Sequence, residues 1–144
     1  MAAVFVDTSA LYALADAADQ WHARAARTAR TLRGADLVTT DLVLAEAWFL
    51  ARARLGRDAA ARLWQEVRAG GARMESIGPD DRDRAWTISR DFADQDFSLT
   101  DCVSFAVVER LGVREAFSFD RDFAVFRYGP RRRVALRVLG LEDG

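Results

Sequence analysis

Four carboxylates stand beside hydrophobic segments in distant parts of the chain, and they constrain its fold more than any other feature. They are Asp7 after Val4–Val6, and Glu46, Asp101 and Asp120 beside later apolar runs. An acid next to an apolar run is held near the core, where an unpaired charge costs free energy. Several acids held in this way predict one shared cation, and their hard oxygen atoms suit Mg²⁺ or Mn²⁺.

The order of short and long segments around these acids indicates an α/β fold. Short β-branched and aromatic runs predict strands, and stretches with apolar residues at helical spacing predict helices. The expected strands are 3–6, 37–39, 73–77, 116–119 and, at an edge, 134–138. The expected helices are 8–15, 21–32, 42–55, 58–69, 81–92 and 99–111. This alternation predicts a three-layer α/β/α sandwich with a central parallel sheet.

Such a sheet would bring the acids together. Ligands of open parallel sheets gather beyond the carboxyl ends of the strands, and Asp7 and Asp120 come directly at two of these ends. Asp101 falls in the first turn of its expected helix and Glu46 in the second turn of its own. Positions 42, 46, 49, 50 and 53 share a helical face, so Glu46 is expected to be a lone charge on an inward apolar stripe.

Each acid also has a purely structural interpretation. Asp7 alone can cap the helix that follows it. The segment from Ser98 to Asp101 fits a capping box. Asp120 and Asp122 fit an ordinary polar turn, and Glu46 can pair with an arginine from elsewhere in the fold. The interpretation as a shared metal site is favoured because three of the four acids end or follow apolar runs at the same expected sheet edge.

Composition limits the classes of protein that remain. The 144 residues fit one domain over 1–144, and 51% hydrophobic with 30% charged residues indicates a soluble globular protein. No apolar run approaches the roughly 18–20 residues that span a bilayer, and Asp7 interrupts the first one, so neither a membrane span nor a signal peptide is expected. A single cysteine, Cys102, excludes an internal disulfide and suits the cytoplasm.

The near-neutral total charge hides an uneven distribution. Residues 110–137 contain eight arginines and three acids, a balance of +5, whereas residues 75–101 contain eight acids and three arginines, a balance of −5. A basic end beside acidic loops can bring a phosphate chain to a metal site, although an uneven solvated surface explains the same pattern. The candidates for phosphate contacts are Arg121, Arg127, Arg131, Arg132 and Arg133.

Each of the four acids lies in a short motif: Asp7 in Val-Asp-Thr-Ser, Glu46 in Leu-Ala-Glu, Asp101 in Ser-Leu-Thr-Asp and Asp120 in Phe-Ser-Phe-Asp-Arg-Asp-Phe. Together these motifs resemble the PIN domain family, most of all the VapC-type toxins of VapBC toxin–antitoxin pairs. The resemblance covers essentially the whole chain. One departure is Gln95, where the family often has a lysine; it leaves the four acids untouched.

The resemblance implies an endoribonuclease that depends on Mg²⁺ or Mn²⁺, with Asp7, Glu46, Asp101 and Asp120 as the catalytic metal ligands. Thr8, Ser118 and Asp122 take supporting places, and whether Asp122 replaces or supplements Asp120 stays open, as does the number of metal ions. A catalytically silent RNA- or metal-binding module and a receiver-like phosphohydrolase remain as alternatives. The last usually needs a lysine, and this chain has none.

The implied partners are an RNA substrate, a cognate antitoxin and a second copy of the chain. The expected helices carry more large aromatic side chains than one small core absorbs, so some are expected to face a partner. These aromatic residues are Trp21, Trp48, Phe49, Trp64 and Trp86.

Overall fold

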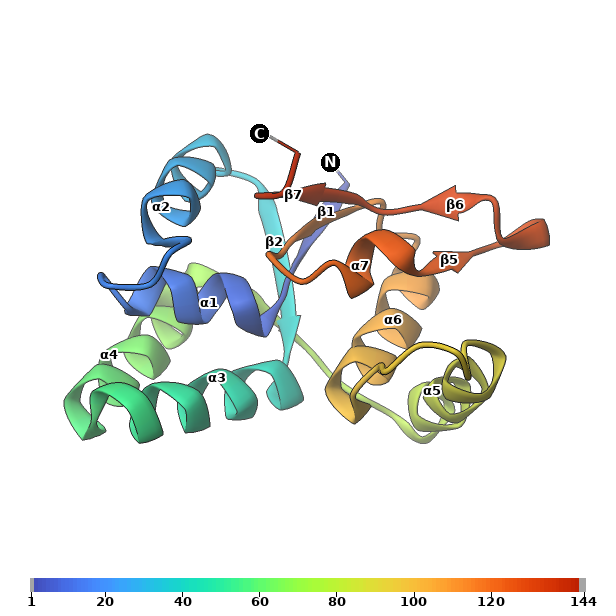
Figure 1. Ribbon diagram of the computed structural model, residues 1–144, viewed down its shortest axis with the longest axis horizontal. Helices are drawn as coiled ribbons and strands as arrows, with labels where there is room; N and C mark the ends of the chain where they lie inside the picture. The colour runs from blue at the N-terminus through green and yellow to red at the C-terminus, as the bar shows by residue number, and fades with distance from the viewer. Residues whose placement is uncertain (1, 143–144) are drawn as a thin grey trace.

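The structure is a computed structural model that describes residues 2–142 (Figure 1). Met1, Asp143 and Gly144, the ends of the expected 1–144 domain, lie outside the described residues. Five parallel strands form one sheet in the order β3-β2-β1-β4-β7. Their bounds are Ala3–Val6 (β1), Asp36–Thr40 (β2), Arg73–Glu75 (β3), Glu115–Phe117 (β4) and Arg137–Leu139 (β7). The predicted fold class is confirmed.

Helices cover both faces of the sheet. One face carries α1 and α2, the other carries α5, α6 and the short α7, and α3 and α4 form a hairpin that packs against α1 (Figure 1). The helices are Thr8–Ala15 (α1), His22–Thr31 (α2), Asp41–Leu55 (α3), Arg57–Glu66 (α4), Pro79–Asp91 (α5), Leu99–Leu111 (α6) and Asp122–Val125 (α7).

The alternation of side chains along β1 explains the layers. Val4 and Val6 belong to the cluster beneath α1 and α2, whereas Phe5 belongs to the larger cluster beneath α5 and α6. Phe5 pairs in register with Val38 of β2 and Ala116 of β4, which lie in the same larger cluster. Successive strand residues point to opposite faces, so this short strand is buried on both sides.

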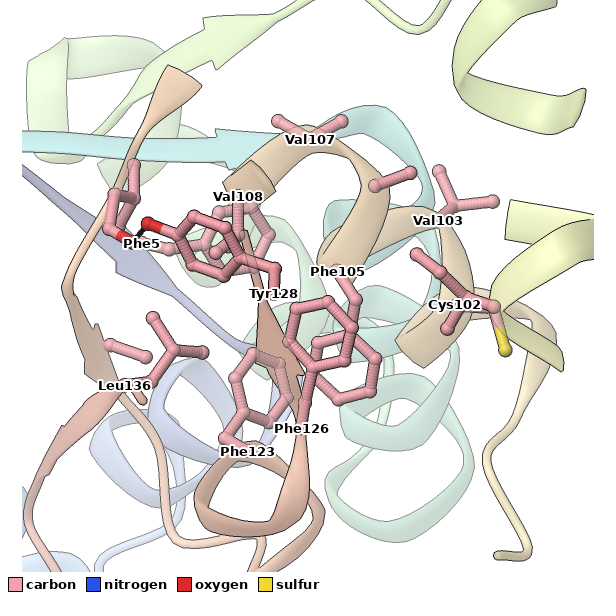
Figure 2. Packing of buried hydrophobic residues seen from close by; sticks show 14 of the residues in the cluster. Phe5, Cys102, Val103, Phe105, Val107, Val108, Phe123, Phe126, Tyr128 and Leu136 are labelled. Atoms are coloured by element: carbon pink, nitrogen blue, oxygen red, sulfur yellow. Dashed lines mark hydrogen bonds between the residues drawn. The ribbon is translucent and has the colours of Figure 1, made fainter. Parts of the chain in front are cut away.

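Aromatic packing fixes α6 against the C-terminal part of the chain (Figure 2). The Phe105 ring stacks on Phe126 with 4.4 Å between centroids and meets Phe123 edge-on at 4.8 Å. The Tyr128 hydroxyl donates a hydrogen bond of 2.6 Å to the Val113 carbonyl. Since α6 carries Asp101, this core holds one of the candidate site residues in place.

The expected inward stripe of α3 is wrong. The buried residues of this helix are Val43, Ala47 and Ala51, while Phe49 is 65% exposed and Glu46 is half-buried at the margin. Alanines at 47 and 51 let α3 approach α4 closely, where Ala60 and Leu63 meet them. Close approach through small residues leaves the larger side chains of α3 outside the contact.

The C-terminal third departs most from expectation. The expected strand 134–138 is two strands: β6 (Val134–Ala135) pairs antiparallel with β5 (Arg127–Tyr128), and β7 forms the sheet edge. The strand expected over 116–119 ends at Phe117, and the helix expected over 58–69 ends in a π-helical turn, Val67–Gly71.

Among residues 2–142, no helix has the length and apolar character to cross a membrane.

Candidate metal centre

The carboxyl ends of the two central strands place Asp7 and Asp120 together. β1 ends at Val6 and β4 at Phe117, and the Asp7 amide donates to the Phe117 carbonyl at 3.0 Å, which continues the pairing of the strands. The Asp7 carboxylate is 3% exposed and makes no capping hydrogen bond to the helix that follows it. Asp7 therefore stands at the N-cap position of α1, but its side chain does not cap that helix.

Two serine hydroxyls hold the Asp7 carboxylate. Ser9 and Ser118 each donate from Oγ to its Oδ2 at 2.9 Å. Ser118 Oγ also accepts from the Asp120 amide at 3.0 Å, and Ser9 Oγ accepts from the Phe119 amide at 2.9 Å. These bonds tie the segment after β4 to the start of α1, so the positions of Asp7 and Asp120 are coupled.

Asp120 also belongs to a group of three aspartates whose carboxylate oxygen atoms lie close together. One carboxylate oxygen from each of Asp101, Asp120 and Asp122 lies within 4.8 Å of the others. Asp120 Oδ1 accepts from the Asp122 amide at 2.9 Å, the geometry of an Asx turn. Asp122 thus stands beside Asp120 rather than in its place.

The N-terminus of α6 positions Asp101. Ser98 Oγ accepts from the Asp101 amide at 3.0 Å, and Asp101 Oδ2 accepts from the Ser98 amide at 3.2 Å, so the expected capping box is present. The cap uses only one carboxylate oxygen of Asp101, Oδ2. Asp101 can therefore cap α6 and also belong to the group of three aspartates.

Burial and mutual repulsion make these acids hard to ionise. Burial raises the pKa of Asp7 to about 6, against the hydrogen bonds from Ser118 and Ser9 and with a small contribution from the charge of Asp120. Burial, followed by the charges of Asp120 and Asp7, raises the pKa of Asp101 to about 7. The pKa of Asp122 is also raised, first by burial and then by Asp120 and Asp96. A divalent cation would relieve this stored repulsion.

Glu46 lies apart from the aspartate cluster. It occupies the second turn of α3, as expected, and is half-buried, but it does not belong to the group of three aspartates. Among residues 2–142 it forms no ion pair with an arginine, so the structural alternative proposed for it is not observed. Its role as a metal ligand stays a prediction.

The five candidate arginines divide into two groups. Arg127 donates to the carbonyls of Ala124, Val125 and Phe126, and Arg132 pairs with Asp91 at 3.4 Å and lies over the Phe92 ring. Arg121, Arg131 and Arg133 have no ion pair within residues 2–142. The second group therefore has its guanidinium donors available for phosphates.

Sequence reasoning passed over two residues of the site. Ser9 shares the Asp7 carboxylate with Ser118, and Asp96 adds its charge near Asp122. A hydroxyl two residues after a strand-end aspartate is the signal that points to Ser9. Thr8, placed among the supporting residues, is 5% exposed, and its Oγ1 has no hydrogen-bond partner within the described chain.

The donor set fits a hard divalent cation. The clustered donors are carboxylate oxygens. Within residues 2–142 no histidine joins the group, and burial followed by the charge of Asp101 raises the pKa of the neighbouring Cys102 thiol, which disfavours its thiolate. Mg²⁺ and Mn²⁺ prefer such ligands, whereas zinc and copper prefer nitrogen and sulfur. The pKa of Asp7 and that of Asp101 are raised first by burial and also by neighbouring carboxylates, and a bound divalent cation would offset both effects.

Fold and site together define an α/β/α protein with an acidic centre at the carboxyl edge of its parallel sheet. The chain belongs to the PIN domain family, whose model matches residues 4–127. The family predicted from the motifs is therefore confirmed.

Individual relatives agree with this assignment. The chain is 32% identical over 121 residues to the 23S rRNA-specific endonuclease VapC20 of Mycobacterium tuberculosis, covering 84% of this chain and 92% of the relative. It is 29% identical over 137 residues to Ribonuclease VapC26 of the same organism, covering 95% and 94%. The crystal structure of VapC20, titled a sarcin-ricin loop cleaving toxin, superposes with a TM-score of 0.78 over 85% of this chain and 93% of that one, at 32% identity. PAE2754 from Pyrobaculum aerophilum, 23% identical, shares the fold with a TM-score of 0.61, covering 94% of this chain and 88% of that one.

The Ser118 hydroxyl offers a test of the coupling between Asp7 and Asp120. Ser118→Ala removes one donor to Asp7 and one acceptor for the Asp120 amide, and loss of such a supporting contact typically costs about 10–100-fold in metal affinity or activity. We expect a loss in that range in metal titrations followed by calorimetry. Ser104→Ala is the matched control, because Ser104 is fully buried but its hydroxyl has no hydrogen-bond partner among the described residues. Equal effects of the two substitutions would contradict the proposed coupling.

Proposed function

We propose that the protein is an endoribonuclease that depends on Mg²⁺ or Mn²⁺ and acts as the toxin of a type II toxin–antitoxin pair. The observation that carries this proposal is the gathering of Asp7, Asp101, Asp120 and Asp122 at one edge of the sheet, with raised pKa values for three of them. The family and the ribonuclease relatives support an RNA substrate.

Asp7, Glu46, Asp101 and Asp120 would hold the metal, and Asp122, which lies in the same cluster as Asp101 and Asp120, would support Asp120. When bound, one or two divalent ions supply an activated water and offset the charge of the scissile phosphate. Ser9 and Ser118 orient Asp7 by binding one oxygen and leaving the other for the centre. Thr8, with its buried hydroxyl, and Ser118 are the proposed supporting residues.

Arginines near the centre would hold the RNA strand. Arg121 directly follows Asp120, and Arg131 and Arg133 lie at the β5–β6 turn. Arg127 and Arg132 are proposed to contribute mainly by fixing this segment, since their guanidinium groups already bind protein atoms. Such contacts position a nucleic acid without reading its sequence.

Incubation of the purified protein with RNA tests the proposed activity. Bulk RNA and a sarcin–ricin loop oligonucleotide would each be incubated with Mg²⁺, with Mn²⁺ or with EDTA, and the products sized on a denaturing gel. We expect internal cleavage with either metal and none with EDTA. Binding without cleavage in every condition would favour the catalytically silent module, and cleavage that survives EDTA would exclude a metal mechanism.

The proposed partners are a cognate antitoxin and a second copy of the chain. Trp48, Phe49 and Trp64 are exposed on the α3–α4 hairpin, and Trp86 is exposed on α5, whereas Trp21 stacks on Phe119 within the fold. A pocket of about 330 Å³, lined in part by Leu44, Trp48 and Trp64, opens on this hairpin. Exposed aromatic groups of this size suit a protein interface. The proposed location is the cytoplasm, where a toxin that cleaves RNA would meet its substrate.

Light scattering tests the oligomeric state. We expect a dimer at tens of micromolar, and we expect co-expression with an antitoxin encoded beside the gene to suppress both toxicity and cleavage. A strictly monomeric protein that is harmless without any partner would remove the toxin proposal while leaving the nuclease proposal in place.

A further inference from the structure

A basic pocket lies between α2 and the carboxyl end of the edge strand β7. Figure 1 shows where these two elements lie in the fold. Its volume is about 320 Å³. The polar and charged residues that line it are Arg24, Arg27, Thr28 and Thr31 of α2, and Arg137 and Glu142 opposite them, beside Gly140.

The positive charge of this pocket comes from α2. Arg137 is paired with Glu142 at 2.6 Å and with Glu115 at 3.5 Å. Arg24 and Arg27 form no ion pair within residues 2–142, so the pocket keeps two uncompensated cations. Two arginines without acidic partners in one pocket favour an anionic ligand.

Two contacts position the guanidinium group of Arg24 for such a ligand. Its Nη1 donates to the Gly140 carbonyl at 3.2 Å, and its guanidinium lies over the Trp21 ring at 5.6 Å. One of five N–H donors is used in this way, and the planar fork of the remaining donors matches phosphate geometry. Arg27, one turn further along α2, is exposed and adds a second guanidinium to the same pocket.

The pocket adjoins the segment that carries the acidic centre, because Gly140, which lines the pocket, lies against Phe119 and the Ser118 carbonyl. Trp21 stacks on Phe119 with 5.1 Å between ring centroids, and Phe119 stands between Ser118 and Asp120. A Cβ atom on Gly140 would lie 2.8 Å from Phe119 Cε1 and 3.0 Å from the Ser118 carbonyl, so only glycine fits this approach. The pocket is therefore joined by direct packing to the segment that carries Ser118 and Asp120.

We propose that this pocket binds a backbone phosphate of the RNA strand at a distance from the bond that is cut. The inference rests on the proposed function and adds a substrate contact to it. The cluster of aspartates repels a polyanion, so a strand that crosses it needs cations on its flank to stay bound. Arg24 and Arg27 would supply this anchor on the side of α2, away from the arginines of the β5–β6 turn.

Three variants separate this anchor from general charge effects. Arg27→Gln removes a cation that forms no ion pair in the described part of the chain, and the double variant Arg24→Gln, Arg27→Gln removes both pocket cations. Arg30→Gln is the control, because Arg30 lies on the same helix but does not line the pocket. Arg27→Gln keeps the test valid even if loss of Arg24 disturbs the packing on Trp21.

Fluorescence anisotropy with labelled single-stranded RNA, in EDTA and over a salt series, measures the contact directly. Each phosphate contact to a single strand contributes about −0.7 to the slope of log affinity against log salt. We expect Arg27→Gln to make the slope shallower by about 0.7, the double variant by about 1.4, and Arg30→Gln to match the wild type. Unchanged slopes in both pocket variants would overturn the proposal.

Cleavage assays distinguish failure of the anchor from failure of the nuclease. We expect the pocket variants to lower kcat/KM on long RNA and to match the wild type on an oligonucleotide trimmed to the cleaved bond. If the wild type cleaves long RNA and the variants cleave it equally well, the proposed phosphate contact is refuted and the nuclease proposal stands. If no protein cleaves RNA, the nuclease proposal is refuted, and the salt dependence of binding still tests the phosphate contact. Normal RNA binding with weakened binding of the antitoxin would assign the pocket to an acidic peptide and overturn the proposal.

Discussion

Replacing Asp101 by asparagine is expected to lower RNA cleavage by more than about 100-fold while the protein stays folded. Loss of a residue that merely supports a metal ligand costs about 10–100-fold, so loss of a proposed ligand should cost more. Asparagine keeps an oxygen to accept from the Ser98 amide, so the cap of α6 should survive. The measurement is the cleavage rate across a Mn²⁺ titration, together with circular dichroism.

Other substitutions rank the acids and control for charge. Asp7→Asn and Asp120→Asn should match the loss at Asp101, Glu46→Gln should also abolish cleavage, and Asp122→Asn should be milder than Asp120→Asn. Asp58→Asn is the control, since Asp58 is an exposed acid in the first turn of α4, outside the cluster. Wild-type rates for Asp101→Asn at every metal concentration would show that the site is wrongly assigned.

The metal-free protein is expected to lose stability as the pH rises from about 4 to about 7. The pKa values of Asp7 and Asp101 in the folded protein are about 6 and about 7, above the ordinary 3.8. The folded state therefore binds more protons than the unfolded state in this interval, and the free energy of unfolding falls as the pH increases. At 1.36 kcal/mol per pKa unit, ionisation of each of these carboxyl groups lowers the free energy of unfolding by about 2–4 kcal/mol at pH 8.

Thermal melts in EDTA check the direction of this effect. Asp101→Asn should raise the melting temperature at pH 8 by roughly 5–10 °C and leave it nearly unchanged at pH 4, because the wild-type carboxyl is then protonated in the folded state. Saturating Mn²⁺ should stabilise the wild type by about 3 kcal/mol at 100 times its Kd and should stabilise the double variant Asp7→Asn, Asp101→Asn much less. An equal rise in the melting temperature of Asp101→Asn at pH 4 and at pH 8 would contradict this electrostatic account.

Much of the fold was predictable because its main elements are long or strongly apolar. The strand Ala3–Val6 and the helix Leu99–Leu111 were expected with the same bounds that the structure has. Gly112, with φ of 66°, ends α6 where the sequence places a stop. The parallel order of strands then brought Asp7 and Asp120 to one edge, as the alternation of elements predicted.

The rest depended on contacts that leave little trace in the sequence. The strands β5 and β6 have two residues each and α7 has four, too few for a periodic pattern. In α3, the choice of inward face depended on the partner helix α4, which favours alanines over larger residues. At the site, the place of Asp122 in the cluster depends on the turn made by Asp120, and Ser9 joins the site only because Phe119 returns beside it.

Anomalous diffraction from a crystal grown with Mn²⁺ tests the central claim most directly. The account predicts a manganese peak among Asp7, Asp101, Asp120 and Asp122, bound by at least one oxygen of Asp101 or Asp120, with no peak there in the Asp101→Asn protein. A manganese peak elsewhere on the molecule, with this cluster empty at saturating metal, would contradict the assignment of the aspartate cluster as the metal centre.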